Sequence, residues 1–389
     1  MNFVTSIRNH IPMRTTSIGE ITEVVTKGTT PTSVGHQFQE RGINFVKVES
    51  IRQDGTFIRN KLAKISDDCH AGLRRSQLHS GDILFSIAGA LGRTAIVTDD
   101  ILPANTNQAI AIIRLKESVQ VDRRFVLYAL SPSLMLDQVE KQKGGVAQQN
   151  LSLAQIKGFK IPLPPLEEQK RIVAVLDKAF ADLDRAHALA EANVADAEEL
   201  FKRELACAFA RAEDCAEPRS FEKLCKALTP KTKIMRKNYL EEGDHPIVSQ
   251  EADLISGYWN DESALMGLDE PVVVFGDHTR CMKYVDFDFV VGADGTKVLK
   301  PHDGIDPLYL YYGLRSIPIA EKGYARHFRF LKEASLPDLG EDQQRQLATG
   351  LQEVELKASQ LRNEYEAKLD DIDNLRQSVL QKAFAGELT

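Results

Sequence analysis

The chain has 389 residues, which is enough for two or three domains with a core each. It has 43% apolar and 27% charged residues, five cysteines in no C-x-x-C pair, and no apolar run near the ~18 residues of a membrane span, so its composition excludes a disulfide-built secreted domain and a membrane protein. The N-terminus carries no signal-peptide pattern, and we expect a cytoplasmic protein with reduced thiols.

The distribution of charge is more informative than its sum. The net charge of −7, taken whole, argues against a nucleic-acid-binding protein. Residues 1–165, however, carry 20 Lys or Arg and 14 Asp or Glu, and the acidic excess lies mostly in two later helical segments. Because only charged faces contact phosphate, the first part of the chain remains a candidate for DNA binding.

The first part of the chain reads as strands followed by a helix. β-branched runs separated by glycine predict strands within 42–51, 81–97 and 105–115, and a helical pattern covers 122–135. A later part repeats this order, with strands expected within 245–254, 270–292 and 296–301 and a helix at 306–316. This repeated order indicates two α/β domains.

A proline-rich elbow precedes each of two predicted long helices. In IPLPPLEEQKR, which starts at Ile161, proline holds the chain extended. Glu167 and Glu168 then suit the positive end of a helix. A second copy, LPDLGEDQQRQL, starts at Leu336, roughly 175 residues after the first. A device used twice is more typical of an architectural joint than of an active site.

The two copies correspond at both ends of the helices. Pro337, Gln343 and Arg345 match Pro162, Gln169 and Arg171, and 375–385 resembles 200–210. Each segment has one apolar stripe, which a single helix of ~45 residues and roughly 65 Å cannot bury alone. Two such helices in one chain can pair as an antiparallel coil. The residues expected to pair the helices or dock partners are Leu166, Ile172, Leu176, Leu183, Leu200, Leu347, Leu351, Leu361, Ile372 and Leu375.

The sequence therefore predicts an α+β protein with a pseudo-twofold internal repeat. Two α/β domains, 1–165 and 216–335, are joined by two long antiparallel coiled-coil helices within 166–215 and 336–389.

Several motifs resemble one known family over nearly the full length. They are IPLPPLEEQKRIV from Ile161, GDILFSIAGALGRTAIV from Gly81, NTNQAIAI from Asn105 and GGVAQQNLSLAQIKGFKIPLP from Gly144. Together they are similar to the specificity subunit, HsdS, of type I restriction–modification enzymes. The second copy departs from this pattern, since Asp338 and Gly340 replace Leu163 and Pro165.

The resemblance implies a function for each part. Each domain would be a target-recognition domain that reads one half of a bipartite double-stranded DNA sequence. The helices would set the spacing and dock methyltransferase (modification) subunits. A motor–nuclease (restriction) subunit would join them. S-adenosylmethionine, and ATP with Mg in a restriction complex, would be bound by these partners, and this chain would hold no cofactor, no metal and no catalytic residue.

Motif searches agree with a non-catalytic chain. There is no phosphate-binding G-x-x-x-x-G-K-[ST] loop, no Asn/Asp-Pro-Pro-aromatic motif, no G-x-G-x-x-G and no H-E-x-x-H. Asp277 beside His278 is better interpreted as a polar loop than as a catalytic pair. Two alternatives stay open, namely a self-contained nuclease or methyltransferase and a coiled-coil scaffold that never touches DNA.

DNA contacts are expected from cations and amides in the loops of both domains, although a solvated surface charge is an equal interpretation for any one of them. In the first domain they are Lys27, Thr29, Thr30, Lys47, Arg52, Arg74, Arg75, Arg93, Lys143, Gln148, Gln149 and Asn150. In the second they are Lys231, Lys233, Arg236, Lys237, Arg280, Lys283, Arg326, His327 and Arg329.

Overall fold

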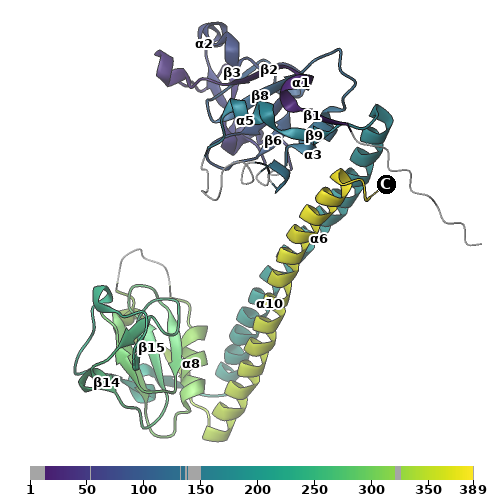
Figure 1. The fold of residues 1–389 in the computed structure, drawn as a ribbon. Helices are drawn as coiled ribbons and strands as arrows, with labels where there is room; N and C mark the ends of the chain where they lie inside the picture. Colours follow the sequence, from purple (N-terminus) through teal and green to yellow (C-terminus); the bar gives the residue numbers. More distant parts are fainter. Residues whose placement is uncertain are drawn as a thin grey trace, which may run out of the picture. The chain divides into compact units, whose positions relative to one another are not determined.

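The computed structural model describes residues 14–52, 54–131, 133–135, 138, 150–319 and 326–388. It divides the chain into two compact units, Met1–His187 with Asp370–Thr389, and Ala188–Leu369 (Figure 1). Each unit contains one α/β domain and a stretch of both long helices, α6 (Leu166–Glu213) and α10 (Glu341–Phe384). The long helix α6 begins at Leu166, and α10 begins at Glu341.

The domain of the first unit is built on a four-stranded sheet and a three-stranded sheet, with strand orders β2-β8-β5-β6 and β4-β3-β7. Its elements are β1 (Thr15–Ser17), α1 (Ile18–Ile21), β2 (Thr22–Lys27), β3 (Ile43–Val46), β4 (Ala63–Ile65), α2 (Asp67–Gly72), β5 (Ile83–Ser86), β6 (Thr94–Ile96), β7 (Ala104–Thr106), β8 (Ile110–Leu115), α3 (Arg123–Ala129), α5 (Leu153–Gly158) and β9 (Lys160–Pro162).

The four-stranded sheet of this domain is covered on both faces. Ile83 and Phe85 of β5 pack into one apolar cluster, and Leu84 between them packs into another. Successive side chains of a strand point to opposite faces, so a strand buried on both faces must be apolar throughout. This is why ILFS and IAII read as unbroken apolar runs in the sequence.

The domain of the second unit has sheets of order β11-β18-β15-β16 and β13-β12-β17-β14. Its elements are β10 (Pro218–Ser220), α7 (Phe221–Leu224), β11 (Cys225–Leu228), β12 (His245–Val248), β13 (Gly257–Trp259), β14 (Leu265–Met266), β15 (Val272–Gly276), β16 (Met282–Val285), β17 (Phe289–Val291), β18 (Thr296–Pro301), α8 (Pro307–Ser316), α9 (Phe328–Leu331) and β19 (Ser335–Pro337).

The two domains share one topology. In each, an antiparallel four-stranded sheet takes its strands in the same chain order, and the second sheet contains a parallel pair, β3 with β7 and β12 with β17. Each domain also begins and ends on a two-stranded sheet, with Thr15 opposite Pro162 and Pro218 opposite Pro337. The chain therefore enters and leaves each domain at one place, immediately before a long helix. The predicted fold class and internal repeat are confirmed.

The long helices pair in each unit. In the first unit Ile172, Leu176 and Phe180 of α6 pack with Leu380 and Ala383 near the end of α10. In the second unit the residues that pack are Phe201, Leu205 and Phe209 of α6 with Ala348, Leu351 and Ala358 of α10. The beginning of one helix meets the end of the other in both places, which is antiparallel pairing.

The residues expected to pair the helices fall into three groups. Ile172, Leu176 and Leu351 are buried, and Leu166, Leu183, Leu347 and Ile372 are half-buried. Leu200, Leu361 and Leu375 lie exposed, at 47%, 38% and 50%, so the structure takes them out of the packed stripe. The neighbouring Phe201, and not Leu200, packs into the apolar cluster of the second unit.

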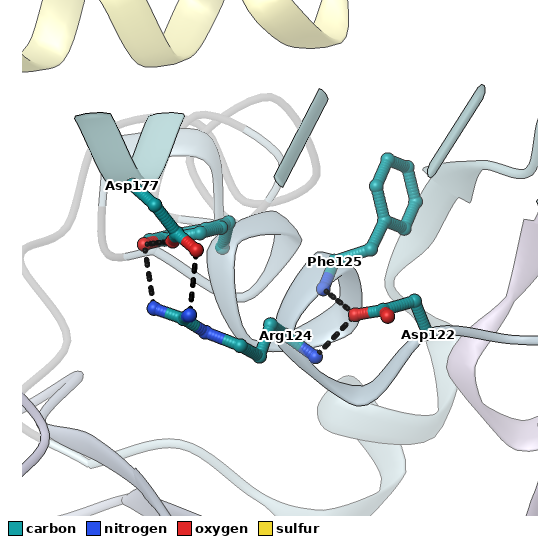
Figure 2. Close-up of polar contacts among 5 residues, drawn as sticks. Asp122, Arg124, Phe125 and Asp177 are labelled. Atoms are coloured by element: carbon teal, nitrogen blue, oxygen red, sulfur yellow. Dashed lines mark hydrogen bonds and ion pairs between the residues drawn. The ribbon is translucent and has the colours of Figure 1, made fainter. Parts of the chain in front are cut away.

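A short helix fastens the first domain to α6. The carboxylate of Asp122 accepts hydrogen bonds from the backbone N–H groups of Arg124 (2.8 Å) and Phe125 (3.0 Å) and so caps α3 (Figure 2). The guanidinium of Arg124 lies 2.5 Å from the carboxylate of Asp177 on α6, and the hydroxyl of Tyr128 donates to the same carboxylate at 2.6 Å. Asp122 thus stabilises the start of α3, and Arg124 and Tyr128 of the same short helix bind it to α6.

The second unit repeats this fastening with other residues. The carboxylate of Asp306 caps α8 by accepting from the N–H groups of Leu308 and Tyr309, each at 2.9 Å. The hydroxyl of Tyr312 donates to Glu355 of α10 at 2.8 Å. Asp306 and Tyr312 hold the same spacing as Asp122 and Tyr128, although the residues between them differ.

The repeat differs by one residue from the alignment read off the sequence. Gln169 is completely buried, and its counterpart by burial is Gln344 at 1% exposure, whereas Gln343 is exposed. The match of Gln169 with Gln343 was therefore wrong. Two adjacent glutamines cannot be distinguished by letter, and only their packing decides between them.

Candidate nucleic-acid interface

A basic hollow opens on the surface of the second domain. It measures about 520 Å³ and is lined by Asp277, Lys297, Arg326, Phe328, Arg329 and Lys332. The cations come from β18 and from the segment around α9, two parts of the chain that lie far apart in the sequence. We call these six residues the basic hollow.

Asp277 holds α9 in place from the end of β15. It is 4% exposed, and its carboxylate accepts from the backbone N–H of Phe328 at 2.8 Å. Its carbonyl oxygen accepts from the backbone N–H of His327 at 2.9 Å and lies 3.0 Å from Nδ1 of that histidine. The carboxylate of Asp277 is thus hydrogen-bonded to the backbone. Of the surrounding cations, Arg326, Arg329 and Lys332 are exposed to solvent.

An aromatic ring forms the floor for two of these cations. Nζ of Lys297 lies 5.5 Å and Nζ of Lys332 lies 5.3 Å from the centre of the Phe328 ring. The guanidinium of Arg329 lies 4.6 Å from the ring centre of Phe330. Cations near an aromatic face are stabilised without being neutralised. In the described part of the chain, none of the hollow's four cations forms an ion pair with a carboxylate.

This arrangement suits a phosphodiester backbone. Unpaired Lys and Arg side chains attract phosphate and release its counterions on contact. The half-buried Phe328 adds a flat apolar surface of the kind that packs against sugars or bases. Among the described residues, no group of three or more His, Cys, Asp or Glu is placed to hold a metal ion.

The first domain presents a tight loop after β2. The N–H of Gly28 donates to the carbonyl of Ile110 at 3.3 Å, and that of Thr29 donates to the carbonyl of Thr106 at 3.1 Å. A Cβ atom on Gly28 would lie 2.0 Å from the Thr106 oxygen, so only glycine fits here. The hydroxyl of Thr30 is bonded to Gln108. The loop is therefore fixed by backbone bonds, with Lys27 exposed beside it.

A family match covers this first domain. Residues 11–193 match the family model described as "Type I restriction modification DNA specificity domain". This part of the chain is similar to type I specificity domains. The match extends through the elbow into α6, and it confirms the family resemblance found in the motifs.

The chain is also similar to a curated type I specificity subunit and to solved structures. The chain is 35% identical over 144 residues to the type I restriction enzyme EcoBI specificity subunit of Escherichia coli, which covers 37% of this chain and 30% of that protein. It therefore spans about a third of that relative. A solved chain from a type I restriction–modification system, described with its complex assembly and conformational transition, matches with a TM-score of 0.78 at 19% identity, over 97% of this chain and 99% of that one.

A second structure shares the fold. The HsdS subunit from Thermoanaerobacter tengcongensis matches with a TM-score of 0.57 at 19% identity, over 96% of this chain and 97% of that one. The family model stops at residue 193, whereas these structural matches run through the second unit. The fold of the specificity domain is thus present in both halves of the chain.

The cations predicted in the second domain are partly accessible. Arg326 and Arg329 line the basic hollow, and Lys231 and Lys237 are exposed. Arg236 is exposed as well, and its guanidinium lies 2.9 Å from the carboxylate of Glu251. These five stay predicted DNA contacts.

The other four residues predicted in the second domain are buried or half-buried. His327 is 1% exposed, and Lys283 is 5% exposed and donates to the carbonyl of Asp253. Burial lowers the pKa of Lys283. Neither side chain reaches the surface, so the structure removes both from the candidate contacts. The half-buried Lys233 donates a hydrogen bond to the Thr296 carbonyl at 2.7 Å, and the half-buried Arg280 donates one to the Ile319 carbonyl at 3.1 Å.

In the first domain the predicted contacts divide in the same way. Lys27, Arg52, Arg74, Arg75 and Asn150 are exposed, and Thr29 and Thr30 are half-buried. Lys47 is half-buried, 3.9 Å from Glu49 and 4.4 Å from the ring centre of Phe38. The guanidinium of Arg93 donates to the Ile51 carbonyl at 2.9 Å, so it supports a loop. Lys143, Gln148 and Gln149 lie outside the described residues.

Sequence reasoning missed three residues of the basic hollow. Lys297 was read only as part of a strand, and Phe328 and Lys332 were passed over beside the arginines of the same segment. A usable signal existed, because FRFLK places two aromatic residues and two cations directly after the predicted Arg326 and His327.

Proposed function

We propose that this chain is the DNA sequence-specificity subunit of a type I restriction–modification complex and that each domain reads one half of a bipartite DNA target. The observation that carries this proposal is the duplication. The family match stops at residue 193, yet the second domain repeats the strand order of the first domain's four-stranded sheet, its parallel strand pair and its short capped helix. Two domains of one topology with different surface residues suit two different half-sites.

The basic hollow supports DNA contact by the second domain. Its four cations and its aromatic floor offer what a DNA backbone needs, and they belong to the domain that the family match does not reach. Exposed Lys27, Arg52, Arg74 and Arg75 play the equivalent part in the first domain. Which bases are read depends on residues that contact the groove edges.

The long helices serve as the partner-docking surface in this proposal. Leu189 of α6 is 66% exposed and Leu356 of α10 is 59% exposed, the highest values among the exposed large apolar side chains of the described residues. Exposed leucines among acidic residues on a helix suit a protein partner better than DNA. The partners proposed are modification subunits and a restriction subunit. They would bind S-adenosylmethionine and ATP with Mg and carry all catalysis, while this chain holds no cofactor.

Co-expression tests the proposed function. The chain is produced in a methylation-free host together with an adenine methyltransferase (modification) subunit encoded beside it, and methylated adenines are mapped by sequencing. We expect a motif of two short specific halves separated by a fixed number of unspecified bases. The same methyltransferase without this chain is the control and should give no such motif. A continuous motif, or equal methylation with and without the chain, would favour a scaffold without DNA contact.

A further inference from the structure

A buried glutamine closes the junction between the first domain and α6. The Oε1 atom of Gln169 accepts from the backbone N–H of Asp122 at 2.8 Å. Its Nε2 group donates to the carbonyls of Pro164 at 2.8 Å and Gln120 at 3.4 Å. One side chain at the start of α6 therefore joins the proline elbow to the cap of α3.

The second unit contains the same junction. The Oε1 atom of Gln344 accepts from the backbone N–H of Asp306 at 2.8 Å. Its Nε2 group donates to the carbonyls of Leu339 at 2.8 Å and Gly304 at 3.1 Å. Both glutamines use donor and acceptor together, which an ionised carboxylate in the same place cannot do.

Each short helix that a glutamine anchors also touches the other long helix. In the first unit the rings of Phe125 and Phe384, on α10, lie 5.0 Å apart. In the second unit the rings of Tyr309 and Phe209, on α6, lie 5.6 Å apart. The glutamine and the tyrosine–carboxylate bond hold one long helix, and the aromatic pair holds the other. The domain is thus fixed to a helix pair at three separate points.

Such a junction does more than add stability. A buried amide with three bonds has one low-energy orientation, and each neighbouring backbone group loses its partner if the amide turns. A domain fixed at three points cannot rotate about its connection without breaking at least one of them. The junction therefore has the properties of a support that sets orientation.

We infer that Gln169 and Gln344 are positioning residues that fix the angle of each reading domain on the helix pair and so set how strictly the complex measures the distance between half-sites. The inference rests on the proposed function. One base pair moves a half-site by roughly 3.4 Å along the DNA axis. A domain that can tilt reaches half-sites one base pair too near or too far, whereas the bases it reads stay the same.

Gln344→Glu provides the sharpest change, with Gln343→Glu as its matched control. The carboxylate at 344 keeps an acceptor for Asp306 but cannot donate to Leu339 and Gly304, so two carbonyls face a negative charge. At 343 the exposed side chain accepts from the N–H of Gly340 at 3.2 Å, a bond that glutamate can also make. Both variants add the same charge to the first turn of α10.

The readout is methylation by the full chain with its modification subunit on a DNA library. The library carries both wild-type half-sites with spacers of the wild-type length and of one base pair more or less. For Gln344→Glu we expect the ratio of off-length to correct-length methylation to rise roughly five- to ten-fold with unchanged half-site bases, the effect of losing one or two hydrogen bonds. Gln343→Glu should behave like the wild type.

The inference would be overturned if the ratio of off-length to correct-length methylation stayed within twofold of the wild type, or if methylation fell equally at all spacer lengths. The glutamines would then have a purely structural role. If the Gln344→Glu complex does not assemble, Tyr312→Phe removes only the hydroxyl bonded to Glu355 and is judged by the same ratio. A wild-type chain that yields no split motif would instead overturn the proposed function, which separates the two failures.

Discussion

Gln344 makes in the second unit the hydrogen bonds that Gln169 makes in the first: one accepted from the N–H of a capping aspartate, one donated to a carbonyl of the elbow before the long helix, and one donated to a carbonyl just before that aspartate. The sequences around them differ, since PLPPLEEQ precedes one and PDLGEDQQ the other. The two repeats therefore share the hydrogen bonds of this junction, although the residues around the glutamines differ.

Removal of the Tyr312 hydroxyl should weaken the second unit. Tyr312 is buried, its hydroxyl donates to Glu355 at 2.8 Å, and burial raises its pKa, so it stays a donor at any working pH. Tyr312→Phe should lower the Tm by about 2–4 °C, the effect of ~1 kcal/mol in a domain of this size. Tyr365→Phe is the control. Tyr365 is half-buried with Lys368 over its ring, and the substitution should change the Tm by less than ~1 °C. Equal shifts for both variants would contradict a role for the Glu355 bond.

The basic hollow should contribute to DNA affinity through charge. Lys297→Ala and Arg329→Ala should each weaken DNA binding by the assembled complex about 3- to 10-fold, and each should make the log–log salt dependence shallower by about 1. Lys357→Ala removes an exposed cation from α10 that lines no part of the hollow, and it should leave both quantities unchanged. Fluorescence anisotropy at several salt concentrations measures them. An unchanged salt slope for Arg329→Ala would argue against phosphate contact there.

Gly28 should be intolerant of any side chain. A methyl group at Gly28 would lie 2.0 Å from the carbonyl oxygen of Thr106, so the loop that carries Thr29 and Thr30 must move. We expect Gly28→Ala to cost about 1–3 kcal/mol of the free energy of unfolding. Gly72→Ala, at the end of α2 with open space around its Cβ, should change it by less than ~1 kcal/mol. Urea denaturation compares the two, and a Gly28→Ala chain as stable as Gly72→Ala would contradict the loop geometry.

Cys225 should resist alkylation while the protein is folded. Burial raises the pKa of its thiol to about 12, so at pH 8.5 the folded chain holds almost none of the reactive thiolate at this site. Cys207 and Cys215 are exposed and should react. Mass spectrometry after a short iodoacetamide pulse should find more label on these two than on the half-buried Cys281, and label on Cys225 only after unfolding. Labelling of Cys225 at the rate of Cys215 in the folded chain would contradict its burial.

The strands and helices were largely predictable because their local signals are strong. The unbroken apolar runs in β5, β8 and β15 reflect sheets buried on both faces, and the long helices follow from elbows with acidic first turns. The short strands β1, β9, β10 and β19 have three residues each, which is too few for an alternating pattern. The pairing that closes each domain was therefore beyond local sequence reasoning.

The candidate contacts were less predictable because charge alone does not show exposure. His327 looked like a surface residue beside two arginines, yet its ring is fixed under Asp277. Lys283 lies on the buried face of β16 with Val285, alternating with the half-buried Met282 and Tyr284, and the letters MKYV alone do not show which face is buried. The basic hollow joins β18 to α9, and such a meeting of distant segments exists only in the folded chain.

The central claim, that each domain reads its own half of the DNA target, is tested most directly by exchanging one domain. The paired strands β10 and β19 mark the ends of the segment to exchange, because Pro218 lies opposite Pro337 and the chain enters and leaves the second domain there. A chain whose Pro218–Pro337 segment comes from another type I specificity subunit is co-expressed with the same modification subunit, and its methylated sites are sequenced. We predict that one half of the motif changes while the other half stays as in the wild type. A change in both halves, or in neither, would contradict the claim.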